Sequence, residues 1–528
     1  MDPDLPDLDR SFLPSLDEAF ARHADRTCTI FGDDHRTYAD IDAASARVAN
    51  ALTRDGFEPG QHGAVYSRNS GEAFVSALGI VRAGGVWVPL NPSNSPPVNL
   101  EILSRFDCDA LLYEPEYTAT AAEMFERLGG IFVRLPGDDA NGPGVPNDEW
   151  LVGAADVAPT IERQGSDTLC LPQTGGTTGV PKGVMLSHRN FSAMAWATQA
   201  QSDGSPRVTL VAAPMTHVVG RAALVQLVTG NTSVILETVD LDRILDAIEQ
   251  HRITDLFLPP SAIYSLLDHQ RTPTTDFSSL RSFGYGSAPM SIPRLRQAFA
   301  TFGPVMRGGF GQTECPMYIT RHEPAEHFVD GDTTGELVDD DTLRSVGRET
   351  ILSTLAIVDD DANPLPPHTR GEIAVQGPMV SEGYYQDPEA TAAIRQNGWH
   401  LTGDIGVLDD TGRLYIVDRK KDMIISGGFN VHSTDVEAAL HAIDGVAEAA
   451  VIGVPSERWG ESVKAIVRRA DSVMLTEDDI IDRCKDAIGS VMAPKSVDFV
   501  SELPKTAVGK IDKKRLRAPY WAATSRDI

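Results

Sequence analysis

The stretch LPQTGGTTGVPKGVMLSH, residues 171–188, places four glycines, three threonines and one lysine between two apolar segments. Glycines let several backbone N–H groups turn toward one point, threonine hydroxyls add donors, and Lys182 adds a positive charge. These features are typical of a loop that binds a polyphosphate. A glycine-rich surface turn is the alternative, and so many donors beside a lysine disfavour it. A Walker-type loop needs Gly-Lys followed by Ser or Thr, whereas Lys182 follows Pro181 and precedes Gly183, which argues against a P-loop kinase or GTPase.

The length and charge of the chain narrow the class of protein. A chain of 528 residues is too long for one hydrophobic core, so we expect several packed subdomains. The formal net charge of −29 argues against nucleic acid or an anionic membrane as a partner, because both would be repelled. Small molecules are therefore the expected ligands.

The cysteines and the N-terminus indicate a cytoplasmic protein. The five cysteines form no CxxC pair and have no histidine at metal-ligand spacing, so we interpret them as free thiols in a reducing compartment. The acidic start MDPDLPDLDR is unlike a secretory signal. No apolar run reaches about 18 residues, so no membrane span is expected.

The first part of the chain alternates helical and strand patterns. Residues 37–60 carry apolar side chains at helical spacing, with Thr37 as the expected N-cap and Gly56 as the stop. The strand-like GAVYS, a second helical pattern over residues 70–85 and the strand-like VWVPL follow. This alternation predicts βαβ units and a parallel sheet.

Later segments predict three regions. The Gly-, Pro- and Asp-rich residues 135–150 are expected to form an exposed loop. Strands and an amphipathic helix then resume over residues 208–260, and short β-like pieces dominate from Leu337. The predicted fold class is α/β: a large N-terminal region of several subdomains with parallel sheets and a β-rich part, plus a small mobile α+β C-terminal domain. The expected boundaries are an N-terminal domain 1–417, a hinge 418–421 and a C-terminal domain 422–528.

Four further motifs carry a family resemblance: GGFGQTE (308–314), LTGD (401–404), YIVDRKKDMIISGGFN (415–430) and LPKTAVGKI (503–511). In this order, and together with the glycine-rich loop, they resemble the superfamily of acyl-CoA synthetases, nonribosomal adenylation domains and beetle luciferases. The similarity covers nearly the whole chain. Within the superfamily, the sequence most resembles aryl- or fatty-acid:CoA ligases. It implies an ATP-dependent ligase that forms an acyl-AMP and passes the acyl group to coenzyme A.

The resemblance implies a nucleotide site. Its loop would grip the triphosphate, although Gly175 stands where the family usually has Ser. Phe310 offers a flat face for adenine, Asp404 and Arg419 would bind the ribose, and Glu314 would help hold Mg²⁺. The implied nucleotide and cofactor contacts are Thr174, Gly176, Thr178, Gly286, Ser287, Ala288, Phe310, Gly311, Thr313, Asp404, Arg419, Gly427 and Gly428. The implied catalytic residues are Lys510, Thr177, Lys182, Glu314 and His217.

The segment APMTHVVG, residues 213–220, bears on the acid substrate. In amino-acid adenylation domains an aspartate that pairs with the substrate ammonium typically follows the histidine position. Val218 stands there, so the resemblance implies an aryl or medium-chain acyl acid instead. A core histidine bonded to backbone is the alternative interpretation of His217 alone. The implied acid pocket consists of His217, Val218, Val219, Tyr285, Gly309 and Met317.

The acceptor and the domain movement involve the C-terminal motifs. Lys421 matches the family's pivot, Gly427 and Gly428 match the loop that guides pantetheine, and Lys510 matches its mobile catalytic lysine. Ser433 and Asp435 depart from the proline and glutamate common in relatives. The expected partners are therefore a carboxylic acid, ATP and CoA or an amine, with a homodimer left open. The alternatives are an acid–amine ligase, a carrier-protein loader and a non-catalytic nucleotide-binding relative.

Overall fold

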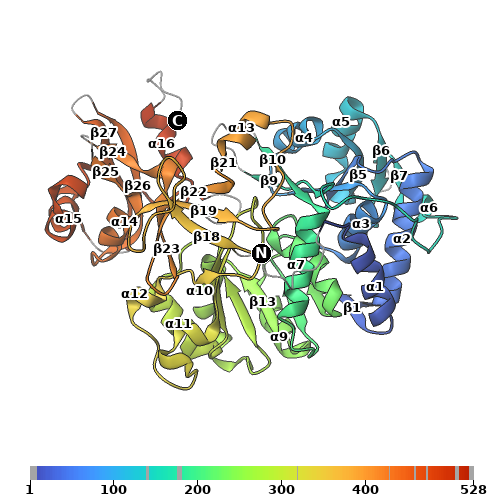
Figure 1. Cartoon of the computed structure of the whole chain (residues 1–528), viewed down its shortest axis with the longest axis horizontal. Helices are drawn as coiled ribbons and strands as arrows, with labels where there is room; N and C mark the ends of the chain where they lie inside the picture. Colours follow the sequence, from blue (N-terminus) through green and yellow to red (C-terminus); the bar gives the residue numbers. More distant parts are fainter. Residues whose placement is uncertain are drawn as a thin grey trace. The chain divides into compact units, whose positions relative to one another are not determined.

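The computed structural model describes residues 9–137, 142–174, 181–317, 319–426, 429–456, 459–470, 474–505 and 511–521. Its contacts divide the chain into two compact units, Met1–Thr354 with Val375–Arg395 and Leu355–Ala374 with Gln396–Ile528. Figure 1 draws the elements, with most of the second unit in orange and red.

The first unit contains a mixed sheet whose centre is parallel. In order its strands are β17 (Arg348–Glu349), β16 (Thr320–His322), β15 (Met306–Phe310), β14 (Ser282–Tyr285), β13 (Asp255–Leu258), β11 (Val208–Val211), β12 (Thr232–Ile235), β1 (Thr27–Phe31) and β2 (Asp34–Thr37). Strands β12, β11, β13, β14 and β15 run parallel to their neighbours in this order. Their carboxyl ends therefore share one edge of the sheet.

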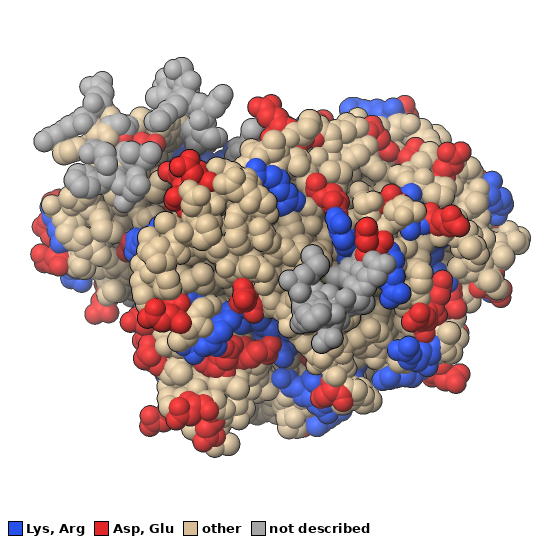
Figure 2. Space-filling view, in the orientation of Figure 1, with Lys and Arg blue, Asp and Glu red and all other residues tan. Residues whose placement is uncertain are grey.

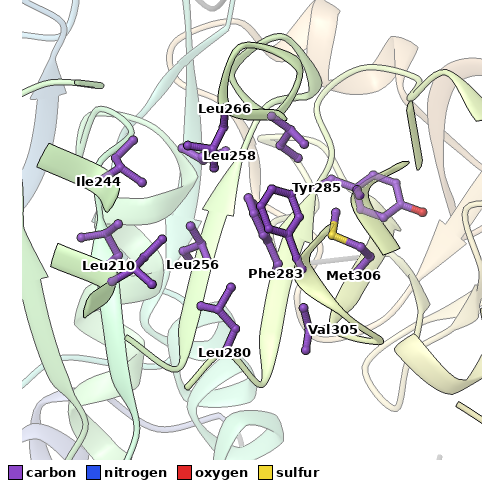
Figure 3. Packing of buried hydrophobic residues seen from close by; sticks show 14 of the residues in the cluster. Leu210, Ile244, Leu256, Leu258, Leu266, Leu280, Phe283, Tyr285, Val305 and Met306 are labelled. Atoms are coloured by element: carbon purple, nitrogen blue, oxygen red, sulfur yellow. The ribbon is translucent and has the colours of Figure 1, made fainter. Parts of the chain in front are cut away.

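Three helices cover one face of this sheet: α9 (Leu241–Gln250), α10 (Pro260–Leu267) and α11 (Ile292–Phe302). Helix α9 begins where the Asp240 carboxylate accepts the Arg243 N–H at 3.0 Å, a standard N-cap. Its buried Ile244 and Ile248 pack into one core cluster with Phe283 of β14 (Figure 3). This core fixes the strand ends that carry the candidate site.

A second sheet of the first unit contains the predicted βαβ units. Its strands are, in order, β20 (Gly383–Tyr384), β10 (Lys182–Ser187), β8 (Thr168–Cys170), β4 (Val86–Leu90), β3 (His62–Tyr66), β5 (Cys108–Tyr113), β6 (Ile131–Arg134) and β7 (Val145–Pro146), with β9 (Gln173–Thr174) beside β10. Strands β4, β3, β5 and β6 are parallel, and α3 (Gly71–Arg82) connects β3 to β4. The prediction of parallel βαβ units is confirmed.

Local signals in the sequence placed the ends of α2 (Tyr38–Arg54) correctly. The Thr37 hydroxyl accepts the Asp40 N–H at 3.1 Å, and the Asp40 carboxylate accepts the Thr37 N–H at 2.8 Å, which is a reciprocal capping box. Gly56 follows the helix with a φ of +90°, a conformation that glycine adopts without a side-chain clash.

One local prediction was partly wrong. Residues 135–150 were expected to be exposed loop, but they end in β7 and in α6 (Asn147–Trp150). Trp150 is buried and donates its indole N–H to Asp55 at 2.7 Å. The tryptophan therefore anchors this segment against α2, which the composition of the segment did not indicate.

The other helices of the first unit are α1 (Leu13–His23), α4 (Pro96–Arg105), α5 (Thr118–Leu128), α7 (His188–Ala200), α8 (Val218–Gln226), α12 (Asp340–Leu343) and α13 (Pro388–Ala393). None of the helices in the described part of the chain combines the length and apolar composition that a membrane crossing needs. All five cysteines are free thiols, as predicted. Acidic and basic side chains are interspersed over the face drawn in Figure 2.

The second unit has two small sheets. One contains β18 (Thr354–Val358), β19 (Gly371–Gln376), β22 (Trp399–Leu408), β21 (Arg395–Gln396) and β23 (Leu414–Arg419), and the other contains β25 (Phe429–Val431), β24 (Ile424–Ser426), β27 (Gly460–Arg469), β26 (Val446–Ser456) and β28 (Ser496–Phe499). Its helices include α14 (Ser433–His441), α15 (Glu477–Met492) and α16 (Lys513–Trp521). The predicted fold class is confirmed. Because compactness does not locate a pivot, the hinge at 418–421 stays a prediction.

Candidate functional site

Three predicted site segments of the first unit follow the carboxyl ends of parallel strands of one sheet. The segment with His217 follows β11, residues 286–288 follow β14, and residues 311–314 follow β15. In open α/β sheets, ligands bind in the crevice at the carboxyl ends of the strands. A Cβ on Gly286 would lie 3.5 Å from the carbonyl oxygen of Gly309, so the start of the 286–288 segment lies against the end of β15.

Tyr285 is the last residue of β14, and a histidine contacts its hydroxyl. Its hydroxyl lies 3.1 Å from Nε2 of His327, whose ring stacks on His322 at a centroid distance of 3.8 Å. Burial lowers the pKa of His327 to about 3 and raises the pKa of Tyr285, so both are neutral. A Cβ on Gly308 would lie 2.7 Å from the Tyr285 hydroxyl, so the first glycine of GGFGQTE makes room for the tyrosine. Figure 3 shows this hydroxyl directed away from the core cluster.

Two predicted site residues have strained backbone. Ser287 has a φ of +67° and Met317 a φ of +62°, the left-handed region that residues with a Cβ adopt at an energetic cost. Such residues gather at active sites and ligand clamps, where the surrounding structure enforces them. Their coincidence with two segments identified from sequence supports a ligand site at this sheet edge.

Strands β9 and β10 hold the two ends of the glycine-rich loop together. Thr174 pairs with Lys182 and Gln173 pairs with Gly183 in antiparallel register. Gly176, Thr177 and Thr178 lie outside the described residues. The Lys182 ammonium is 3.4 Å from a carboxylate oxygen of Asp387 and 5.0 Å from the ring centroid of Tyr384.

Tyr384 joins Lys182 to Glu314. Its hydroxyl donates to Glu314 Oε1 at 2.8 Å, and burial together with the Glu314 charge raises the pKa of Tyr384. The Ser381 N–H donates to the backbone carbonyl of Glu314 at 2.8 Å. Strand β20 brings Tyr384 here by pairing with β10, some two hundred residues earlier. The sequence analysis missed Tyr384 because its local sequence carries no signal for this pairing.

His217 is the N-cap residue of α8, and its Nε2 lies 3.5 Å from the Asn91 amide nitrogen. The first turn of the helix holds Val218, which is half-buried, and Val219, which is buried. Phe310 is likewise buried, at the end of β15. The apolar residues predicted for the acid pocket and the adenine site thus belong to strand ends and one helix start.

The sequence analysis also missed Arg221 of α8. This residue is only 4% exposed, and its Nε has no hydrogen-bond partner among the residues that the structure describes. Burial lowers the pKa of Arg221, while the nearby Cys170 and Glu314 act in the opposite direction. A buried cation with an unsatisfied donor is costly, which makes Arg221 an unusual feature near Glu314.

The second unit holds the predicted ribose pair. Asp404 of β22 and Arg419 of β23 face each other in antiparallel register, with Arg419 Nε 3.3 Å from Asp404 Oδ1. Asp404 is buried, whereas half of the Arg419 side chain is exposed. Lys421 lies in a short 3₁₀ turn, Lys420–Asp422. Gly427, Gly428 and Lys510 lie outside the described residues.

A cleft of about 960 Å³ lies elsewhere in the first unit. It is lined by acidic side chains such as Glu72, Glu114 and Glu237, with Arg36 beside them. Of the predicted site residues that the structure describes, none lines it. Its acidic lining suits neither a triphosphate nor a carboxylate, so we do not assign the nucleotide site to it.

The sequence matches two family models, AMP-binding enzyme over residues 16–385 and AMP-binding enzyme C-terminal domain over residues 435–510. A feruloyl-CoA synthase from Amycolatopsis sp is 33% identical over 501 residues, covering 94% of this chain and 96% of the relative. A Rhodococcus jostii CoA ligase for a methyl-dioxo-octahydroindenyl propanoate is 34% identical, covering 95% and 97%.

Solved structures agree. ATP-bound MatB from Rhodopseudomonas palustris has a TM-score of 0.85 at 30% identity, covering 96% of this chain and 98% of its own. The amide bond synthetase McbA from Marinactinospora thermotolerans has a TM-score of 0.85 at 30% identity, covering 96% and 100%. Both the motifs and the fold therefore lead to one conclusion: the chain belongs to the AMP-binding enzyme family of ATP-dependent, adenylate-forming enzymes.

Proposed function

We propose that this enzyme activates an apolar carboxylic acid, aryl or medium-chain acyl, and transfers it to coenzyme A. A carboxylate oxygen attacks the α-phosphorus of ATP and displaces pyrophosphate, giving acyl-AMP. The CoA sulfur then attacks the acyl carbon, AMP leaves, and the thiol proton passes to solvent. The observation that supports the proposal is that the His217, Gly286 and Phe310 segments all lie at the carboxyl ends of strands of one sheet, in a chain of this family.

The first step needs positive charge where negative charge develops. We assign this role to Lys182, whose ammonium lies 3.4 Å from a carboxylate oxygen of Asp387, and to Lys510. Glu314 is the proposed Mg²⁺ ligand, because Mg²⁺ binds one or two carboxylates together with phosphates. Tyr384 occupies one oxygen of Glu314, and the other has no hydrogen-bond partner among the described residues. When bound, Mg²⁺ would neutralise phosphate charge at this position.

The remaining nucleotide contacts are assigned from the family resemblance. Thr174 and the loop after it would bind the phosphates, together with Thr313. Residues 286–288 would lie along adenine, with Phe310 and Gly311 on its other side. Asp404 would accept hydrogen bonds from the ribose hydroxyls, because a carboxylate can accept from both. Arg419, its register partner, would hold that carboxylate in place.

The acid would lie against Val218, Val219, Tyr285, Gly309 and Met317, with His217 at the mouth of the pocket. Val218 begins α8 and offers no charge partner for an ammonium group. The neutral, buried Tyr285 and His327 give the neighbourhood little charge. These features favour an acid whose aryl or alkyl part carries no charge over an α-amino acid, whose ammonium group would be buried without a partner.

The second step requires a change of domain orientation about Lys421, which brings Gly427 and Gly428 to the acyl-AMP and removes Lys510. This places the two half-reactions on two faces of the C-terminal domain. An acid–amine ligase that uses the same acyl-AMP is the alternative. Two observations support this alternative. The chain is similar to an amide bond synthetase, and Ser433 and Asp435 depart from the proline and glutamate common in relatives.

An ATP–pyrophosphate exchange screen over aryl, alkyl and α-amino acids tests the proposal. We expect exchange with aryl or alkyl acids, and we expect Val218→Asp to weaken it by burying an unpaired charge. Val218→Thr, which keeps the shape without a charge, is the matched control. Preference of the wild-type enzyme for free α-amino acids would refute the acid assignment. Product analysis with CoA and with amines then decides the acceptor.

A further inference from the structure

We propose that residues 432–435, His-Ser-Thr-Asp, form with Asp418 a latch that holds the C-terminal domain in one orientation. These are positioning residues, and they set the balance between acid activation and acyl transfer. The inference rests on the two-step function proposed above. It goes further because it names the contacts that the change of orientation must break.

All four residues of the latch contact chain that precedes the predicted pivot. The Ser433 N–H donates to Asp418 Oδ2 at 2.6 Å, and its hydroxyl donates to the same oxygen at 3.0 Å. His432 Nδ1 lies 3.9 Å from this carboxylate. The Thr434 hydroxyl donates to the carbonyl of Val417, and Asp435 pairs with Arg370 at 3.2 Å.

The centre of the latch is dry. Asp418 is 4% exposed and Ser433 is fully buried, so the N–H to carboxylate bond is charge-assisted and little weakened by water. Lys513 supports it from α16 by donating to the Ser433 hydroxyl at 2.7 Å while pairing with Glu437 at 2.8 Å. The Asp435–Arg370 pair at the rim is half-exposed and contributes little.

Position 433 explains why this contact belongs to this chain. Proline, common at this position in the relatives that the sequence resembles, has no N–H and could not make the bond to Asp418. Serine is the first residue of α14, a position that proline tolerates well. His432 has φ −79° and ψ +123°, which also suits a residue before proline. Ser433→Pro is therefore expected to remove the bond and keep the helix.

The latch lies across the pivot in sequence. Val417 and Asp418 precede Lys421, whereas residues 432–435 follow it. A rotation at Lys421 separates the two groups, so the latch has to open in every catalytic cycle. The step that uses the latched orientation is favoured, and the step that needs the other orientation is slowed.

The test compares Ser433→Pro with Ser433→Ala, which keeps the N–H and loses only the hydroxyl. Two rates are measured in each variant: pyrophosphate exchange, and consumption of supplied acyl-AMP with CoA or an amine. Because a hydrogen bond to a charged group is strong, we expect the ratio of the two rates to shift about tenfold or more in Ser433→Pro. We expect less than about threefold in Ser433→Ala. An unchanged ratio in Ser433→Pro overturns the latch.

Hydrogen exchange of the ligand-free protein gives a second readout that does not need activity. Amides of β23 and α14 should exchange faster in Ser433→Pro than in Ser433→Ala, and equal exchange would also overturn the latch. If no variant activates any acid, the proposed function fails while this measurement still decides the latch. Should Ser433→Pro not fold, Thr434→Val replaces it, with the same direction and a smaller shift expected. Asp435→Ala is the control at the exposed rim, expected to change the ratio less than about twofold.

Discussion

Two cations near the predicted nucleotide site of the first unit have weak contacts, whereas Ser433 and Lys513 beside Asp418 in the second unit make short hydrogen bonds. The Lys182 ammonium has a 3.4 Å contact to Asp387, and the Arg221 Nε has no hydrogen-bond partner in the described part of the chain. In contrast, Lys513 contacts both Ser433 and Glu437 at 2.8 Å or less. We expect groups that bind a ligand to have weak protein contacts, and groups that hold the chain together to be satisfied within it.

The largest effect is expected from Lys510→Ala. The predicted mobile lysine supplies a point charge to the adenylation transition state, so pyrophosphate exchange should fall about 10²- to 10³-fold. Conversion of supplied acyl-AMP should persist, because that step uses the other orientation. Lys514→Ala is the control from the same basic run. Equal loss in both half-reactions would remove Lys510 from this role.

Lowering the pH is expected to change the stability contributions of one buried group in each unit in opposite directions. Burial holds the pKa of His327 at about 3, so its stabilising contribution is complete above about pH 6.5 and is lost as the pH falls. At about 1.4 kcal/mol per pH unit this amounts to about 3 kcal/mol between pH 6.5 and 4.5. His327→Phe should flatten this dependence in urea titrations.

Glu437 of the second unit should behave in the reverse way. Burial raises its pKa despite Lys513, so its contribution is complete below the usual carboxyl pKa and is lost as the pH rises through the folded-state value. The stability of the wild type relative to Glu437→Gln should therefore decrease from pH 4.5 toward 7. If the stability contributions of His327 and Glu437 changed with pH in the same direction, this contrast between the two units would be contradicted.

Lys513→Met tests the second unit, because it removes the cation that contacts both Ser433 and Glu437. It leaves Glu437 buried without its cation, so we expect the free energy of unfolding to fall by about 2 kcal/mol. Chemical denaturation measures the change, and Lys514→Met on the exposed neighbour should change it by less than about 0.5 kcal/mol. A loss no greater than that of the control would mean that the cluster is not a source of stability.

Arg221→Met tests the first unit, where the buried cation is incompletely paired. Removing a buried cation whose Nε is unsatisfied should raise the free energy of unfolding by about 1 kcal/mol. Arg221→Lys keeps the charge and should not stabilise the protein. If Arg221→Met destabilises the protein, the guanidinium is a structural support like Lys513, and the contrast between the two units fails at this residue.

Tyr384→Phe should have the smallest effect. It removes one hydrogen bond to the Glu314 carboxylate and leaves the ring beside Lys182. We expect pyrophosphate exchange to fall about threefold, with a change of less than about 1 kcal/mol in stability. Tyr385→Phe, which loses a hydroxyl bond to Asp107 at 2.9 Å instead, is the control and should exchange normally.

The sequence by itself determined the local elements and the family. Helical spacing and the Thr37 capping signal fixed α2, because capping depends on residues within one turn. The alternation of patterns predicted the parallel strands β3 and β4, and the ordered motifs predicted the family that the comparisons confirm. The roles of the individual site residues remain predictions, and those in 175–180, 427–428 and 506–510 lie outside the described residues.

Only the tertiary structure decided which distant residues meet. Tyr384 reaches Glu314 because β20 pairs with β10, and Trp150 is buried because α2 presents Asp55 to it. Ser433 could be identified from sequence as a departure from the family pattern, but not as a donor to Asp418. Such contacts depend on strand pairing and burial across long separations in sequence, and a local pattern carries no information about either.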